Sequence, residues 1–364
     1  MTETDVRHGP LEDLHRDLGA KLGPFGGWLM PIEYAGTLSE HRAVRERVGL
    51  FDLSHLGKLD VVGPGAFDAL QGLFTNDLRK VEIGRAQYHH LLNEQGGVLE
   101  DLFVYRLGAE RWFVVPNASN KDLVVSALGA AGAEVVDHDD WCFLGIQGPR
   151  SHAVVGRLWP GAVELAFRGC RTVERFGAEI VLTRTGYTGE RGFELFAPAG
   201  SAGELWDALI GAGSDIGIEP CGLGARDVLR LEMGYPLYGQ DLGPERTSLE
   251  AGLGWAISFD KGGFPGRDAL LRQSEAGLPS RLRGLATADR RHIPRSHQDV
   301  SSGGERVGEV TSGTFSPLLG HGVAMAYLSP AQAFEPGAEV EIDIRGRPAP
   351  ARVVTTPFVD RSPR

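Results

Sequence analysis

The segment from Gly96 to Tyr105 constrains the fold more than any other part of the chain. Gly96 and Gly97 end a turn, and the residues that follow are dominated by Val, Leu, Phe and Tyr, which is typical of a β-strand. Glu100 and Asp101 interrupt this strand. A carboxylate beside a buried strand costs free energy unless it is paired or used. Asp101 is therefore either a strand-edge residue that caps a turn or a functional carboxylate.

Three other unusual segments favour the functional interpretation. They are Phe51-Asp52-Leu53-Ser54-His55, the glycine-rich stretch from Thr185 to Glu194, and Gly222-Leu223-Gly224-Ala225-Arg226-Asp227. The last resembles part of a phosphate-binding turn, but Asp227 stands where a third glycine would be needed, so a tight turn before a helix explains it equally well. Arg226 gains nothing from the helix dipole at a helix N-terminus. We expect it to pair with a carboxylate, such as Asp227 or Glu232, or with an anionic ligand.

Glu190 and Glu194 lie four residues apart, with Gly192 suggesting a turn between them. A carboxylate can accept two parallel N–H hydrogen bonds from a flat heterocycle with an N–C–N edge, such as a pterin or a guanine. The alternative is that each glutamate simply faces solvent.

The overall composition excludes several classes of protein. The chain has 364 residues, enough for two or three domains, and a net charge of −11, which argues against nucleic-acid binding through a broad basic surface. Its three cysteines show no Cys-x-x-Cys spacing, so neither a zinc site nor a disulfide framework is expected, and a reducing cytoplasm fits. The acidic, polar residues 1–5 have no apolar core, so we expect no signal peptide. The sequence has no run of about 18 apolar residues, so no membrane span is expected, and no Gly-x-Ser-x-Gly motif. His55 is ambiguous, and His89 and His90 should point to opposite faces of a strand and serve structural roles.

Apolar periodicity predicts a mixed α+β body rather than a regular β-α-β fold. Helices are expected over residues 11–22, 38–48, 65–73, 120–129, 202–212 and 225–232. Strands are expected over residues 59–62, 88–92, 102–106, 112–115, 141–146, 179–183 and 193–197.

The composition changes after a candidate linker at residues 274–280. Residues 281–364 contain no lysine, and their eleven arginines against nine acidic residues give a net charge of +2. Short strands separated by Gly and Pro turns predict a small β-barrel or sandwich. These strands are expected over residues 306–311, 323–328, 339–344 and 351–355.

Taken together, the unusual segments resemble one family, the T protein of the glycine cleavage system, a tetrahydrofolate-dependent aminomethyltransferase. Each motif alone is modest, but their order and spacing make the resemblance specific over nearly the whole chain. The matching segments are Leu11–Pro31, Gly49–His55, Gly96–Tyr105, Arg184–Glu190, Pro220–Gly234, Leu237–Gln240 and Gly308–Pro317.

The resemblance implies a three-domain α+β disc that holds folate in a central hole. Two interleaved subdomains would span residues 1–275, and a C-terminal β-barrel would span residues 281–364. The catalytic residue would be Asp101, near the folate nitrogens, and Glu194 would bind the pterin edge. The other positions that match folate-contacting residues of the family are Leu56, Tyr88, Asn117, Tyr187 and Arg226.

The sequence departs from the family pattern in three places. Leu56 replaces a common Met, which conserves volume, and Glu100 replaces a common Asp, which we regard as neutral. The chain ends in Asp360-Arg361-Ser362-Pro363-Arg364 where some members have an aromatic tail, so the role of the tail is in doubt.

The implied reaction moves a one-carbon unit from the aminomethylated lipoyl arm of the H protein to tetrahydrofolate and releases ammonia, with no metal. The H protein would bind transiently, and neither nucleic acid nor membrane is expected as a partner. Because the family's H proteins are acidic and this chain is also acidic, a local basic patch must steer docking. The candidate patch contains Arg290, Arg291, His292 and Arg295, although these residues could instead form a solvated loop.

Three alternatives remain at this point. A folate-dependent demethylase or methyltransferase of the same superfamily would act on a free small molecule rather than on a lipoyl protein. A folate-binding assembly factor without transferase activity would carry a Lys-Gly-Cys motif, but Tyr235-Pro236-Leu237-Tyr238-Gly239-Gln240-Asp241 lacks the cysteine. A purely structural protein would not explain the acidic and basic residues in the unusual segments.

Overall fold

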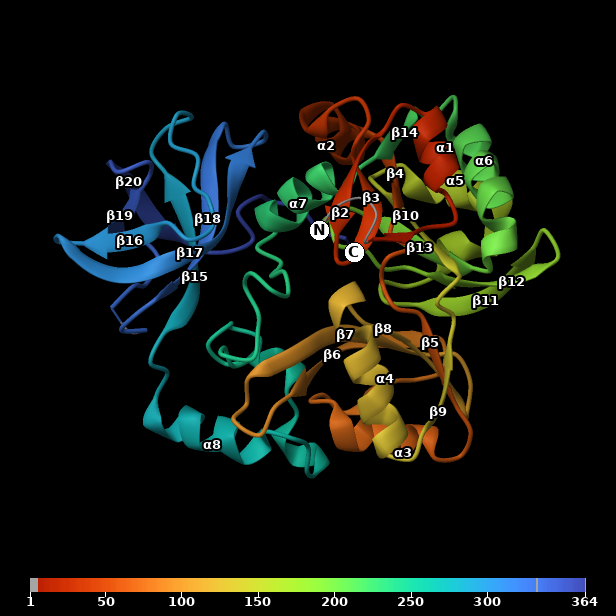
Figure 1. Cartoon of the computed structure of the whole chain (residues 1–364), viewed down its shortest axis with the longest axis horizontal. Helices are drawn as coiled ribbons and strands as arrows, with labels where there is room; N and C mark the ends of the chain where they lie inside the picture. Colours follow the sequence, from red (N-terminus) through yellow and green to blue (C-terminus); the bar gives the residue numbers. More distant parts are fainter. Residues whose placement is uncertain (1–5, 332, 364) are drawn as a thin grey trace. The chain divides into compact units, whose positions relative to one another are not determined.

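The computed structural model describes residues 6–331 and 333–363, which divide into two compact units (Figure 1). Unit 1 consists of residues 6–89, 101–227 and 362–363. Unit 2 consists of His90–Glu100 and Val228–Arg361. The chain therefore leaves unit 1 and returns to it. The predicted domain boundaries, 1–275 and 281–364, stay a prediction.

A six-stranded sheet forms one layer of unit 1, in the order β11-β12-β13-β10-β4-β14. Its strands are β4 (Val48–Asp52), β10 (Cys142–Gln147), β11 (Cys170–Arg175), β12 (Ala178–Thr183), β13 (Gly192–Ala197) and β14 (Ile218–Cys221). Every residue of β4, β10 and β13 is buried, so both faces of these central strands are covered. Side chains from α1 (Glu12–Asp17), α5 (Ser151–Leu158) and α6 (Ala202–Gly213) pack into the same apolar core as these strands.

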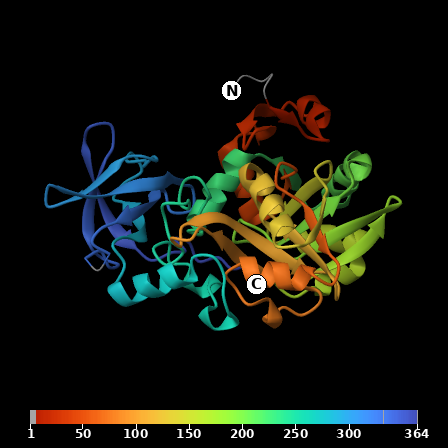
Figure 2. The ribbon, with the colours of Figure 1, turned by 60° about the horizontal axis from the view of Figure 1, so that its bottom comes forward.

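A five-stranded sheet forms the second layer of unit 1, in the order β6-β7-β8-β5-β9. Its strands are β5 (Leu59–Val62), β6 (Arg85–Leu92), β7 (Val98–Arg106), β8 (Arg111–Val115) and β9 (Glu134–Asp137), coloured orange to yellow in Figure 2. The helices α3 (Ala66–Leu73) and α4 (Lys121–Ala130) pack on each other. Phe67 of α3 contacts Trp112 of β8 with ring centroids 6.2 Å apart, so α3 covers one face of this sheet.

An aromatic cluster joins the two sheets of unit 1. Phe196 of β13 lies 5.0 Å from Phe113 of β8, 6.3 Å from Tyr105 of β7 and 4.1 Å from Phe143 of β10, measured between ring centroids. Tyr105 and Phe113 are paired neighbours across β7 and β8. Aromatic pairs at these separations contribute about 0.5–1.5 kcal/mol each beyond the burial of their area. The cluster fixes the face of β7 that carries Tyr105 against the other sheet.

The remaining elements of unit 1 are short. A three-stranded sheet has the order β1-β3-β2, and α2 precedes β4. Their bounds are β1 (Arg7–His8), β2 (Lys21–Phe25), β3 (Trp28–Glu33) and α2 (Thr37–Glu46). The helix α7 (Leu223–Glu232) begins in unit 1 and continues into unit 2.

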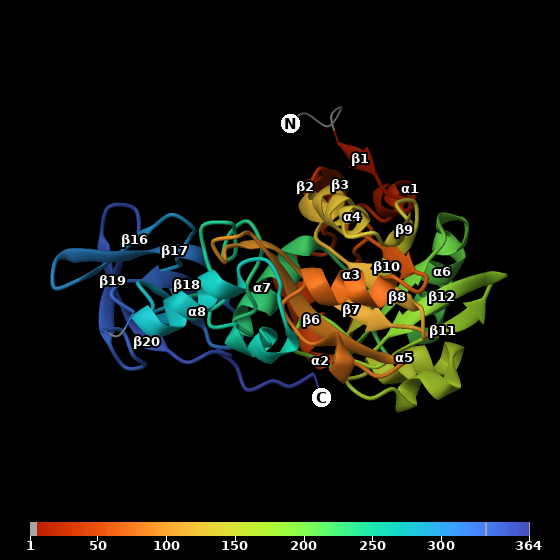
Figure 3. The same ribbon diagram turned by 90° about the horizontal axis from the view of Figure 1, so that it is seen from below.

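Unit 2 contains α8 (Arg267–Ala276) and a closed barrel of six strands in the order β15-β18-β17-β16-β19-β20 (Figure 3). The strands are β15 (Arg281–Thr287), β16 (Asp299–Ser302), β17 (Glu305–Ser316), β18 (His321–Leu328), β19 (Glu339–Asp343) and β20 (Pro348–Val354). Alternate residues such as Val340, Ile342, Ala351 and Val353 fill its interior. A bulge in β17 between Val310 and Ser312 bends that strand, which helps a small barrel to close. The predicted C-terminal barrel and the mixed α+β class are confirmed.

Most predicted elements are present with small shifts at their ends, but three predictions are wrong. The helix expected over residues 11–22 ends at Asp17, because Gly19 adopts φ +72° and stops it, and Leu22 lies in β2. Gly192 is the first residue of β13 rather than a turn between Glu190 and Glu194. The expected linker over residues 274–280 is shorter, because α8 continues to Ala276.

Candidate functional site

Asp101 lies in the middle of β7, and two side chains hold its carboxylate. The hydroxyl of Tyr88 on β6 donates a hydrogen bond to Oδ2 of Asp101 over 2.7 Å. The amide of Asn117, just after β8, donates to Oδ1 over 3.0 Å and to the Asp101 carbonyl over 3.2 Å. The neighbouring Glu100 is completely buried and, by strand alternation, points to the opposite face. The structure therefore brings three of the predicted site residues into direct contact.

Burial governs the chemistry of this carboxylate. Loss of water contact raises the pKa of Asp101 to about 6, although the hydrogen bonds from Tyr88 and Asn117 act in the opposite direction. A carboxyl group with such a pKa exchanges a proton near neutral pH, which suits general acid–base work.

A row of aromatic side chains extends from Asp101 along one face of the sheet. The rings of Tyr88 and Phe103 lie 5.5 Å apart, and those of Phe103 and Tyr105 lie 6.0 Å apart. Asp101, Phe103 and Tyr105 share a face because side chains alternate along a strand. The hydroxyl of Tyr105 lies 3.3 Å from Oγ1 of Thr185. The row therefore connects Asp101 with the loop between β12 and β13.

Glu194 of β13 lies at the other end of this row. Its side chain is buried, and Thr185 donates a short hydrogen bond to Oε2. Oγ1 of Thr183 lies 2.6 Å from Oγ1 of Thr185, and the hydrogen bond between these hydroxyls restrains the Thr185 side chain. Burial raises the pKa of Glu194, whereas the Thr185 hydrogen bond and the charge of Arg226 lower it. Among the residues that the structure describes, no hydrogen bond to Oε1 is found, so this oxygen is able to accept a ligand N–H group.

Arg226 and Tyr187 form a stacked pair near Glu194. The guanidinium of Arg226, in the first turn of α7, lies 4.7 Å from the centroid of the Tyr187 ring. Tyr187 projects from the loop that joins β12 to β13. A cation over an aromatic face restrains both side chains. We expected Arg226 to interact with a carboxylate. In the structure its positive charge acts on Glu194 and lowers the pKa of that carboxyl group.

Leu56, the last predicted residue, follows the buried Phe51–His55 segment. The amide of its neighbour Gly57 donates to the carbonyl of Pro116 over 2.9 Å, which places Leu56 close to Asn117. Gly57 is needed here, since a Cβ atom would lie 2.6 Å from Pro116.

Several residues that support the site were missed in the sequence. Thr185 bonds to the Glu194 carboxylate, and the hydroxyls of Thr183 and Tyr105 contact Thr185 in turn. These hydroxyls give no signal until the strands are paired. His55 is buried against Phe25 with rings 5.3 Å apart, and burial together with the charge of Arg226 lowers its pKa to about 3, so it is neutral. The two adjacent histidines have different partners: His89 accepts from the Asn76 backbone amide, and His90 bonds to Ser248.

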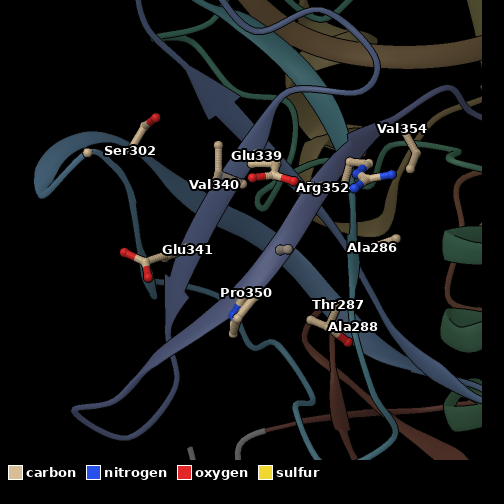
Figure 4. Close-up of a pocket in the computed structure, with 12 residues that line it drawn as sticks. Ala286, Thr287, Ala288, Ser302, Glu339, Val340, Glu341, Pro350, Arg352 and Val354 are labelled. Carbon is tan, nitrogen blue, oxygen red and sulfur yellow. Dashed lines mark hydrogen bonds and ion pairs between the residues drawn. The ribbon is translucent and has the colours of Figure 1, made fainter.

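Other candidate sites are weaker. Within residues 6–331 and 333–363, no group of three or more His, Cys, Asp or Glu side chains is arranged to hold a metal ion. A hollow of about 690 Å³ on the barrel lies between β15, β16, β19 and β20 (Figure 4). Its wall includes Glu339 and Arg352, which bond to each other over 3.3 Å, and none of the predicted site residues. No described helix has the length and apolar character needed to cross a membrane.

Comparisons with known proteins identify the family of the whole chain. The family model for the GCVT N-terminal domain matches residues 11–261, and that for the glycine cleavage T-protein C-terminal barrel domain matches residues 281–360. A Mycolicibacterium paratuberculosis protein named aminomethyltransferase is 48% identical, covering 98% of both chains. A Frankia alni protein of the same name is 46% identical, covering 99% of this chain and all of its own. The crystal structure of the glycine cleavage system aminomethyltransferase T from Bartonella henselae has a TM-score of 0.91 at 35% identity, covering 98% of this chain and 99% of its own.

The raised pKa of Asp101 predicts how stability depends on pH. The folded state holds the proton more tightly than the unfolded state, so stability falls as the pH rises from about 4 to about 6 and then levels off. Asp101→Asn removes the free-energy cost of keeping this carboxyl group ionised in the folded state. We expect the variant to be more stable than the wild type by about 1–3 kcal/mol above pH 7, with the difference vanishing near pH 4.

Urea unfolding between pH 4 and pH 8 measures this difference. Asp60→Asn is the matched control, because the pKa of Asp60 is lowered by its hydrogen bonds with His138 and Arg111 despite burial. That variant should be less stable than the wild type at pH 7. A loss of stability in Asp101→Asn at pH 7 would contradict the raised pKa.

Proposed function

Because the chain belongs to the glycine cleavage T-protein family and is an aminomethyltransferase, we propose that tetrahydrofolate binds on the face of unit 1 that carries Asp101 and Glu194. The single observation that carries this proposal is a pair of carboxylates, Asp101 partly buried and Glu194 buried, each with a raised pKa and each held by neutral donors. Neither carboxylate has its charge cancelled by a direct ion pair among the interactions described above. Such groups are suited to binding and moving protons on a nitrogen-rich ligand.

The residues present fit tetrahydrofolate. Glu194 keeps acceptor capacity toward a ligand, since Thr185 occupies only Oε2, and a pterin presents parallel N–H donors to such a carboxylate. Phe103 and the Tyr187–Arg226 pair, which are only partly buried, offer flat surfaces for an aromatic ligand between the two carboxylates. Leu56 and Asn117 are proposed to line the same pocket.

Tetrahydrofolate, when bound, supplies the nucleophilic nitrogens that accept the one-carbon unit. In the proposed mechanism, Asp101 holds a folate amine through its carboxylate and takes up or returns a proton as the one-carbon unit is transferred and ammonia is released. Tyr88 and Asn117 orient the carboxylate so that a lone pair faces the ligand. A positioned group of this kind accelerates a reaction by about 10²–10⁴-fold. Holding the one-carbon donor and the folate that accepts it in one site also orients the two for reaction.

The donor is proposed to be the aminomethylated lipoyl arm of an H protein, which docks transiently in the cytoplasm. Arg290, Arg291 and Arg295 share one loop before β16 in unit 2, and Arg290 and Arg291 are exposed. Asp289 pairs with Arg291, so the loop keeps a net positive charge despite one neutralised arginine. This loop is our candidate for steering the acidic partner.

We predict that Asp101→Asn binds tetrahydrofolate within about tenfold of the wild type but loses most turnover. The amide keeps the shape of the carboxylate, and it can still accept from Asn117 while donating to the Tyr88 oxygen, but it carries no exchangeable charge. Ammonia release from aminomethylated lipoyl protein, with and without tetrahydrofolate, measures the effect. Near-wild-type turnover would rule out the catalytic role.

We predict that Glu194→Gln weakens tetrahydrofolate binding more than it slows the bound complex. Glutamine offers one acceptor and one misplaced donor where the carboxylate offers two acceptors, at a cost of roughly 1.5–3 kcal/mol. Calorimetry gives the dissociation constant, and saturating folate gives kcat. An unchanged dissociation constant would remove Glu194 from the pterin site.

We predict that reversing Arg290 and Arg291 to Glu raises the apparent KM for the lipoyl protein and leaves folate affinity unchanged. The effect should shrink in 1 M salt, where screening acts over about 3 Å. Reversing Arg345 and Arg347, in the turn between β19 and β20, is the matched control. An identical KM at low salt would place the docking surface elsewhere.

A further inference from the structure

The loop over residues 184–191 joins β12 to β13 and presents Tyr187, with Thr185 at its start and Glu194 just beyond its end. Unlike most loops it is largely buried: Thr185, Thr188 and Glu190 are each at most 6% exposed. Buried loop backbone must find hydrogen-bond partners outside a regular ladder. The side chains that supply these partners therefore decide where the loop lies.

Gln147, the last residue of β10, is one such side chain. Its Nε2 donates to the carbonyls of Thr185 over 3.3 Å and Phe193 over 3.4 Å, on either side of the loop. Its Oε1 accepts from Oγ1 of Thr188 over 2.9 Å. One amide thus joins the start, the middle and the end of the loop.

Two glycines let the loop close on Gln147. A Cβ atom on Gly186 would lie 2.1 Å from Oε1 of Gln147, and one on Gly192 would lie 2.3 Å from it. Because any side chain at these positions would displace the amide, the loop backbone and Gln147 fit each other closely.

Arg45 of α2 supplies the second set of contacts. It is 3% exposed, and its Nη1 donates to the Thr188 carbonyl over 2.7 Å and to Oε1 of Glu190 over 3.0 Å. A buried ion pair contributes little net stability, since desolvation offsets the attraction, but it can specify one conformation. Glu190 is therefore an internal anchor of the loop, unlike Glu194, whose carboxylate faces the proposed ligand.

We propose that Arg45 and Gln147 are positioning residues of the folate pocket, which set the placement of Tyr187 and Glu194 by fixing the loop between them. This inference rests on the proposed function. Gln147 bonds to the carbonyls of Thr185 and Phe193 and to the Thr188 hydroxyl, and Arg45 bonds to Thr188 and Glu190. Both residues therefore act on Tyr187 and Glu194 through the loop. Their loss should change affinity for folate beyond what a loss of stability explains.

The test separates two effects of losing Arg45: the loss of stability from burying the Glu190 charge without this partner, and the loss of folate affinity from releasing the loop. Arg45→Met leaves the Glu190 carboxylate buried without this partner and should lower Tm. Arg45→Met combined with Glu190→Gln removes that charge and should regain much of the lost Tm. The dissociation constant for tetrahydrofolate should stay raised by roughly 10–100-fold in both variants, because the loop is still released from α2. Arg45→Lys keeps the positive charge but loses the planar guanidinium group, so the dissociation constant should rise less in this variant.

Gln147→Met provides a second variant that keeps volume and adds no charge. It should also raise the dissociation constant, with kcat at saturating folate reduced less than affinity. The matched control is Arg111→Met combined with Asp60→Asn, which removes an ion pair between β8 and β5 in the same unit. That control should lower Tm without changing the dissociation constant.

Hydrogen exchange of the amides of residues 184–191 gives a readout that needs no ligand. Exchange should accelerate in the Arg45 and Gln147 variants and not in the control. Unchanged loop exchange, or wild-type folate affinity in the double variant, would overturn the inference while leaving the proposed function in place. Failure of the wild type to bind tetrahydrofolate would instead overturn the proposed function, and the role in a folate pocket with it.

Discussion

The partial burial of Asp101 in the middle of a strand is the constraint on which the site depends. A carboxylate withdrawn from water holds its proton more tightly, so the protein gives up stability at neutral pH to keep it there. Tyr88 and Asn117 limit that cost by donating to both oxygens without supplying a positive charge. A direct arginine partner would lower the pKa well below neutrality and remove the capacity for proton exchange. The neutral donors are therefore part of the chemistry as well as of the packing.

The second carboxylate uses the same arrangement on the facing sheet. Thr185 and Thr183 hold Glu194, and Tyr105 connects them to the strand that carries Asp101. The aromatic cluster around Phe196 keeps the two sheets of unit 1 in contact, so the distance between the carboxylates is set by packing. The loop over residues 184–191 lies outside the regular hydrogen bonding of the sheet. Its position is set by buried hydrogen bonds from Arg45 and Gln147.

The sequence predicts the elements that carry strong local patterns. Leu59–Val62 coincides with β5, and the short strands separated by Gly and Pro turns after residue 280 predict a small barrel or sandwich, of which the structure has the barrel. Weak local patterns account for the strands that were not predicted, since Asp299–Ser302 contains one apolar residue and pairs only because its neighbours form the barrel. The site residues came mainly from family resemblance. Arg45 and Gln147 were not predicted, because their partners lie 143 and 38 residues away in the chain and nothing local marks them.

The pH dependence of kcat/KM for tetrahydrofolate-dependent ammonia release tests the central claim most directly, because it reports the ionisation of the free enzyme. The account predicts that the wild-type profile loses activity below about pH 6, at the raised pKa of Asp101. It also predicts that this acid limb is absent from the residual activity of Asp101→Asn. The same limb in both proteins, or a wild-type profile without one between pH 5 and pH 7, would contradict the assignment of Asp101 as the acid–base group.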